Sequence, residues 1–251
     1  MKILYPISFS LLIISTVVYA DFEEGGQAFL RGDYENAATE FISLAKRGDH
    51  RAMYALGTMY SAGLGVEKNL NKSFKLFSEA VQNGRYDAMY KLGLMYELGE
   101  GVDKNIKKAV RLYQKSAKSG YPYGQYRFGM MYSNGTGVKF NPVNAYAWLV
   151  IASHYFIYKT SQVNDTTNES FEKVKYRLLF EQQQENERIL DEITQHLHKL
   201  KKEMSEEDIE KTKQKVIKIS KSRKKYQSVR FKNGRLTSNI ENLFLPDTLY
   251  Y

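Results

Sequence analysis

The chain has 251 residues, a formal net charge of +9 and no cysteine. Without cysteine, the chain has no disulfide bonds, thiolate zinc sites, cysteine nucleophiles or cysteine-linked lipid. A chain of this length accommodates one large domain or two small ones.

The first twenty residues have the pattern of an export signal. Lys2 supplies a positive charge, residues 3–18 are mostly apolar, and Ala20 ends a small-residue cleavage pattern. The apolar run is short for a membrane span, and no charged stop follows it. We therefore expect residues 1–20 to be a cleaved signal peptide and the protein to be exported, either periplasmic or secreted. An uncleaved anchor is the alternative.

A repeat of 36 residues is then written three times without a gap. LGTMYSAGLGVEKN begins at Leu56, LGLMYELGEGVDKN at Leu92 and FGMMYSNGTGVKFN at Phe128. A constant period in this range is typical of stacked units, none of which buries its apolar face alone. We therefore expect function on the extended surface of the stack rather than in one deep pocket.

Each unit is predicted to be a pair of helices. In the unit 49–84, apolar residues have the spacing of one helical face, at Ala52, Leu56, Met59 and Tyr60. Glycines 63 and 65 end this helix, and a second helix starts after an asparagine that caps its first turn. Glycines inside the first helix predict that another helix crosses there at close range. These structural positions are Asn69, Asn105, Asn141, Gly57, Gly93 and Gly129.

The solenoid is expected to span residues 21–156. A degraded unit at 21–48, with a short turn in place of the glycine loop, precedes the repeats 49–84, 85–120 and 121–156. Residues 145–152 form a second helix with a bulkier apolar face, which a terminal capping helix needs. The expected fold is all-α: a right-handed helix-pair solenoid (an α/α superhelix) with a C-terminal helical extension.

The pattern A-x-x-x-LG-x-MY-x-x-G-x-GV-x-x-N-x-x-K-A resembles the Sel-one-like repeat family, which is related to tetratricopeptide repeats. The resemblance covers about residues 21–153. It implies an adaptor role without catalysis, and exported bacterial members are linked to envelope complexes or host contact. The family usually has aspartate at the three asparagine caps, and both residue types cap helices.

The rest of the chain is predicted to be a polar loop at 157–170, a charged helical extension at 171–226 and a basic, then apolar, tail at 227–251. Within the extension, an apolar seam with spacings of 4, 3 and 4 runs through Ile193, Leu197, Leu200 and Met204. We expect this seam to fold back on the end of the solenoid. Ser205 is expected to cap a further helix that ends near Lys221.

The candidate partner site lies on the first helices, which line the concave side of helix-pair solenoids. Tyrosines repeat away from the core stripe, and basic residues follow two of them, which gives the set Tyr54, Tyr90, Lys91, Tyr126 and Arg127. Tyrosine and arginine are typical anchors of interfaces. We expect this set to bind a protein or peptide partner in the envelope or on a host cell. Packing between adjacent units explains the repeated tyrosines equally well.

A basic segment offers an alternative function. Residues 211–235 hold eleven Lys and Arg and no Asp or Glu. A solvated helix face is the ordinary interpretation of such a run. Binding to an anionic membrane surface or an acidic polymer is the rival, through Lys221, Arg223, Lys224 and Lys225. Nucleic acid is disfavoured as a partner by export.

Catalytic and metal-binding patterns are not found in the sequence. The four histidines have no acidic partners at metal-ligand spacing, and His196 and His198 do not share a helix face. We expect no metal, no cofactor and no enzymatic activity.

Overall fold

The computed structural model describes residues 22–161, 173–221, 231–232 and 235–236. Residues 22–30 are helical. The helices that follow are α2 (Tyr34–Lys46), α3 (His50–Ala62), α4 (Leu70–Gln82), α5 (Tyr86–Leu98), α6 (Ile106–Lys118), α7 (Pro122–Asn134), α8 (Pro142–Ser161), α9 (Lys173–Glu203) and α10 (Glu206–Lys221). A short strand β1 (Phe231–Lys232) pairs antiparallel with β2 (Arg235–Leu236). The expected signal peptide lies outside the described residues. No described helix has the length and apolar character that crossing a membrane requires.

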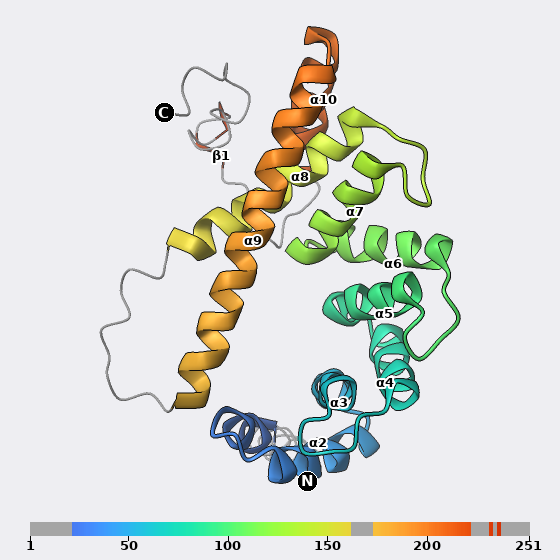
Figure 1. Cartoon of the computed structure of the whole chain (residues 1–251), viewed down its shortest axis with the longest axis vertical. Coiled ribbons are helices and arrows are strands. Elements are labelled where there is room, and N and C mark those ends of the chain that lie inside the picture. Colours follow the sequence, from blue (N-terminus) through green and yellow to red (C-terminus); the bar gives the residue numbers. More distant parts are fainter. Residues whose placement is uncertain (1–21, 162–172, 222–230, 233–234, 237–251) are drawn as a thin grey trace, which may run out of the picture.

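The helices up to α8 stack pairwise into a curved solenoid, and the predicted helix-pair fold is confirmed (Figure 1). The first helices of the three repeats, α3, α5 and α7, lie on the inner side of the curve. The long helix α9 crosses the open side of the curve in this view and packs against α8 and α7. Helix α10 returns along α8.

A glycine in the first helix of every unit lies directly beneath a large side chain of the second helix. A Cβ atom placed on Gly93 would lie 2.6 Å from the ring of Tyr113, a distance that real Cβ atoms do not reach. The other units repeat this contact with Gly57 under Phe77, Gly129 under Leu149 and Gly25 under Phe41. The unfavourable helix propensity of glycine is therefore offset by closer packing of the two helices.

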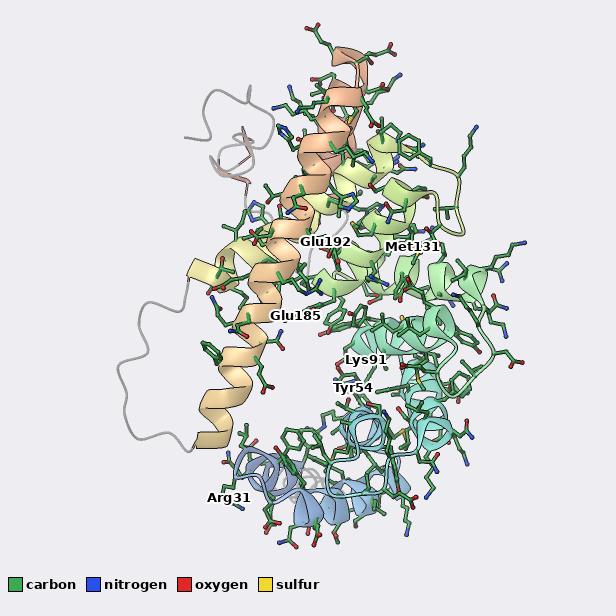
Figure 2. The ribbon with its side chains drawn as sticks, viewed as in Figure 1. Arg31, Tyr54, Lys91, Met131, Glu185 and Glu192 are labelled. Atoms are coloured by element: carbon green, nitrogen blue, oxygen red, sulfur yellow. The ribbon has the colours of Figure 1, made fainter. Side chains whose placement is uncertain are left out.

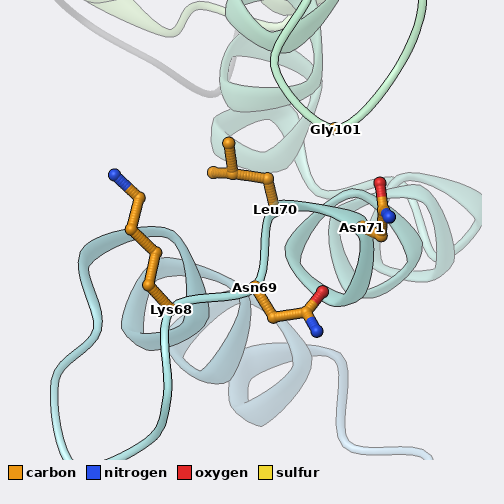
Figure 3. Close-up of a pocket in the computed structure, with 5 residues that line it drawn as sticks. All are labelled: Lys68, Asn69, Leu70, Asn71 and Gly101. Carbon is orange, nitrogen blue, oxygen red and sulfur yellow. The ribbon is translucent and has the colours of Figure 1, made fainter.

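Each long loop rests on the preceding unit. A Cβ on Gly101 would lie 2.4 Å from the carbonyl oxygen of Leu70, at the start of α4. Figure 3 shows this glycine beside Leu70, next to a shallow surface hollow. Gly101 also has a φ of 67°, which a side chain would strain. The second glycine of the loop therefore serves stacking between units as well as the turn.

The repeated asparagines cap the second helices. Their Oδ1 atoms accept hydrogen bonds from backbone amides three residues later: Asn69 from Lys72 (2.9 Å), Asn105 from Lys108 (3.0 Å) and Asn141 from Asn144 (2.8 Å). These bonds satisfy amides that the first turn of a helix leaves without intrahelical partners.

The seam of α9 folds back on the solenoid as expected. Ile189, Ile193, Leu197 and Leu200 are buried in the largest apolar cluster, together with residues of α7, α8 and α10. The capping of α10 also follows the prediction. The Asp208 amide donates to Ser205 Oγ (3.1 Å), and the Ser205 hydroxyl donates to Asp208 Oδ2 (3.0 Å).

The loop predicted at 157–170 is wrong for residues 157–161, which continue α8. Phe156 stands where the two earlier units have Gly84 and Gly120, next to the ends of their second helices. No glycine therefore ends α8 at this point, and Phe156 is fully buried. Residues 162–170 of the expected loop lie outside the described residues.

The glycine contact gives a stability prediction. We expect Gly93→Ala to lower the free energy of unfolding by about 1–2 kcal/mol, because the new methyl group overlaps a fully buried ring. Gly26→Ala is the matched control, since a Cβ at that helical position meets nothing within 4 Å. The control should be neutral or stabilising by up to about 1 kcal/mol. Urea titrations of both variants measure the difference, and equal effects would contradict the role of close packing.

Gln125 gives a second stability prediction. Its side chain is fully buried on α7, and neither amide atom has a hydrogen-bond partner among the described residues. Methionine occupies the same position in the other repeats, at Met53 and Met89. Gln125→Met should therefore raise the free energy of unfolding by about 1–2 kcal/mol, because an unsatisfied amide is replaced by an apolar group of similar size. Thermal unfolding checks the sign, and a lowered midpoint would contradict it.

Candidate functional site

Tyr54 is the first of the predicted partner residues along the chain, and it lies on the inner face of the first two repeats. Tyr54 lies half-buried on α3, with its ring centroid 5.7 Å from that of Phe77. The guanidinium carbon of Arg85, from the next unit, lies 5.0 Å from the ring centroid of Tyr54. Tyr54 therefore packs between units, and part of its ring still faces the inner side, where Figure 2 places it.

Tyr90 belongs to a group of aromatic rings that sequence reasoning missed. We name it the tyrosine cluster: Tyr86, Tyr90, Tyr121, Tyr123 and Tyr155. Successive ring centroids are 5.5–6.2 Å apart, and the members come from α5, α7, α8 and the turn before α7. Burial raises the pKa of Tyr90 to about 12, so its hydroxyl stays protonated at neutral pH. Only Tyr90 shares the repeat phase of Tyr54, which is why periodicity did not reveal the others.

Lys91 lies on the same inner face. It lies half-buried on α5, and burial lowers the pKa of its ammonium group. It forms no ion pair within the described part of the chain. Figure 2 places it on the inner side beside Tyr54, facing α9 and Glu185. A partly desolvated, unpaired ammonium gains free energy when a carboxylate approaches.

Tyr126 does not face an outside partner, contrary to the expectation from sequence. Only 3% of its surface is exposed, and its hydroxyl donates to Glu192 Oε2 on α9 (2.6 Å). Three further contacts join α7 to α9: the Tyr123 hydroxyl donates to Asn186 Oδ1 (2.7 Å) and accepts from Gln182 Nε2 (2.5 Å), and Ser133 Oγ lies 3.0 Å from His196 Nδ1. The chain's own α9 therefore covers the inner face of the third repeat.

Arg127 is also engaged within the chain. Its Nη2 donates to both carboxylate oxygens of Glu97 at 2.6 Å, and Glu97 Oε2 accepts the Tyr113 hydroxyl at 2.6 Å. The three residues come from α5, α6 and α7. We name them the Glu97 network, and it ties the second repeat to the third. Sequence reasoning assigned Arg127 to a partner, because only the fold brings Glu97 within reach.

The basic residues of α10 do not form one free charged face. Lys211 pairs with Glu207 (2.7 Å), Lys213 pairs with Glu210 (3.6 Å), and Lys215 bonds Asn144 Oδ1. Lys221 is exposed at the end of the helix. Arg223, Lys224 and Lys225 lie outside the described residues, so anionic-surface binding stays a prediction for them. Among the residues that the structure describes, no group of three or more histidines and carboxylates could hold a metal ion.

Comparisons with known proteins found a matching family model and similar solved structures. The Sel1 repeat model matches residues 50–84, 87–121 and 122–154. A Sel1 repeat protein from Oxalobacter formigenes is 22% identical, with 74% of this chain and 72% of that chain covered and a TM-score of 0.49. A protective antigen present in uropathogenic Escherichia coli strains, which displays an SLR fold, is 22% identical, with a TM-score of 0.51 and 83% of this chain covered. The match spans only 48% of that antigen. No curated protein matches the sequence.

Residues 50–154 therefore match the Sel1 repeat family, and the resemblance stated from the sequence is confirmed for these residues. Repeats of this family are generally non-catalytic scaffolds for protein–protein interaction. The matched segments begin and end close to the helix pairs α3–α4, α5–α6 and α7–α8.

The Glu97 network yields a prediction that separates structure from binding. Glu97→Gln should lower the free energy of unfolding by about 1–3 kcal/mol, because it weakens two hydrogen bonds and leaves the half-buried Arg127 without a counter-charge. Glu100→Gln, an exposed change of the same chemistry two residues beyond α5, should be near neutral. Chemical unfolding followed by circular dichroism measures both. Equal stabilities would show that the network does not hold the repeats together.

Proposed function

We propose that this protein is an exported, non-enzymatic adaptor that binds an extended segment of a partner protein on the inner face of its first two repeats. The observation that carries the proposal is the partial exposure there of Tyr54, Tyr90 and the unpaired Lys91, whereas α9 covers the third repeat. A partner in the envelope or on a host cell fits the export signal expected at residues 1–20.

The chemistry of this face suggests what the segment carries. Half-buried tyrosine rings offer a flat apolar surface and lose little conformational entropy on binding. They therefore favour a partner segment with aliphatic or aromatic side chains. Lys91 favours a neighbouring carboxylate, because an opposite charge offsets the loss of hydration that burial causes. We expect a segment that alternates apolar and acidic side chains, and binding that persists at high salt because apolar contacts supply most of the affinity.

Affinity capture tests the proposal. The mature chain serves as bait for cell-envelope and culture-medium proteins, beside the variant Tyr90→Ala with Lys91→Ala. We expect at least a tenfold loss of the captured partner, because both the aromatic anchor and the cation are removed. The control, Tyr158→Ala with Lys75→Ala, removes the same residue types from exposed positions on α8 and α4 and should retain the partner.

Helical content and salt dependence distinguish lost binding from lost folding and from binding elsewhere on the chain. If the double variant loses helical content, Lys91→Glu replaces it, since this change leaves the tyrosine packing intact. A partner held equally by wild type and Lys91→Glu would reject the inner face as the site. A partner released by salt alone would favour the basic segment 211–235 instead, since exposed charge pairs are screened.

A further inference from the structure

A cleft outside the inner face combines an aromatic floor with a basic rim. It lies between α10 and the repeats and has a volume of about 760 Å³. Phe128 and Trp148 contribute to its floor, with ring centroids 5.5 Å apart and only 3% and 5% of their surfaces exposed. Tyr132, Val143 and Ile219 add apolar surface. The folding of α10 onto α8 creates this cleft, so the repeats alone do not contain it.

All charged residues that line the cleft are lysines. Lys118 comes from α6, and Lys211, Lys215 and Lys218 come from successive turns of α10. Lys211 is neutralised by Glu207, and Lys215 bonds the Asn144 amide. Lys118 and Lys218 are exposed and form no ion pair with any described residue. Burial, and then the nearby Lys218 cation, lower the pKa of Lys215, as expected for a partly buried cation beside another cation.

The lining defines the chemistry of an occupant. Large apolar side chains fit the floor, and carboxylates fit the two unpaired lysines at the rim. Gln114 lies among the lysines and offers its side-chain amide to a peptide backbone, and the amides of Asn144 and Gln214 keep further hydrogen-bonding capacity beside their bonds to Lys215 and Glu210. An acidic peptide with bulky apolar residues satisfies all three features, whereas an aliphatic lipid tail has no groups that could form hydrogen bonds with the amides.

We infer that this cleft binds residues 237–251 of the same chain. This segment, which lies outside the described residues, has two acids, Glu241 and Asp247, and no Lys or Arg. Its bulky apolar residues are Ile240, Leu243, Phe244, Leu245, Leu249, Tyr250 and Tyr251. It is complementary in charge and in apolar character to the cleft. Residues 222–230 connect α10 to the β1–β2 hairpin that precedes this segment, and they reach at most about 30 Å when extended, which is ample because Lys218 and Ile219 already line the cleft.

A peptide-binding experiment tests this inference without labelling the protein. A chain ending at Leu236 keeps every described residue, and a fluorescein-labelled peptide of residues 237–251 is added to it. We expect saturable binding by anisotropy. The emission of Trp148, the single tryptophan of the chain, should shift as the peptide covers the cleft. The full chain should bind the peptide at least tenfold more weakly, because its own segment competes at high effective concentration.

Charge reversal locates the binding. Lys118→Glu with Lys218→Glu should weaken the peptide at least tenfold, and a peptide with Glu241→Lys and Asp247→Lys should recover part of that loss. Lys75→Glu with Lys107→Glu makes the same change of net charge at exposed positions on α4 and α6 and should have little effect. Circular dichroism confirms that each variant keeps its helices.

Three results would overturn the inference. The first is that the truncated chain fails to bind the peptide. The second is that the control pair of substitutions weakens binding as much as the cleft pair, which would indicate a nonspecific charge effect. Equal binding by the full and truncated chains would show that the cleft is free for a partner's acidic segment rather than filled by residues 237–251. These results do not depend on the inner face, so the adaptor proposal is tested separately.

Discussion

The contact between a glycine of one helix and a bulky side chain of the next is the constraint on which this structure depends. A Cβ atom on Gly93 would lie within 2.6 Å of the Tyr113 ring, so only a glycine allows the two helices to approach this closely. The same contact recurs in all four units, with phenylalanine, tyrosine or leucine above the glycine. Each unit therefore has nearly the same internal spacing. Regular stacking follows, because each loop then meets the same place on the unit before it.

The end of a solenoid is a different physical problem, because its last apolar face has no following unit. Here α8 presents this face, and α9 and α10 bury it in the largest apolar cluster of the described residues. This cover has two consequences for function. Helix α9 covers the inner face of the third repeat, so a partner cannot bind there. Helix α10 creates a cleft that the repeats alone do not form. The capping helices thus determine which surfaces of the solenoid are accessible.

The sequence predicted those features whose causes are local. The asparagine caps and the helix-ending glycines depend on contacts inside one unit, and the residue type at each of these positions is characteristic. They therefore recur visibly with the period of the repeat. The fates of Tyr126 and Arg127 were not predictable in this way. Tyr126 meets Glu192, which is 66 residues away, and Arg127 meets Glu97 on a different repeat. Neither glutamate has a distinctive local pattern, so the sequence left partner binding and packing between units as equal alternatives for the tyrosines and gave no internal partner for Arg127.

The two candidate surfaces have opposite arrangements of the same residue types. On the inner face Lys91, which has no ion pair with a described residue, stands among half-buried tyrosines. Apolar contacts therefore supply most of the affinity there, and the lysine favours ligands with a carboxylate. In the cleft two unpaired lysines stand at the rim of a small aromatic floor, so charge supplies a larger share of the attraction than on the inner face. Electrostatic attraction between exposed groups weakens with salt, whereas burial of apolar surface does not. One protein that used both surfaces would hold one ligand at any ionic strength and release the other as salt rises.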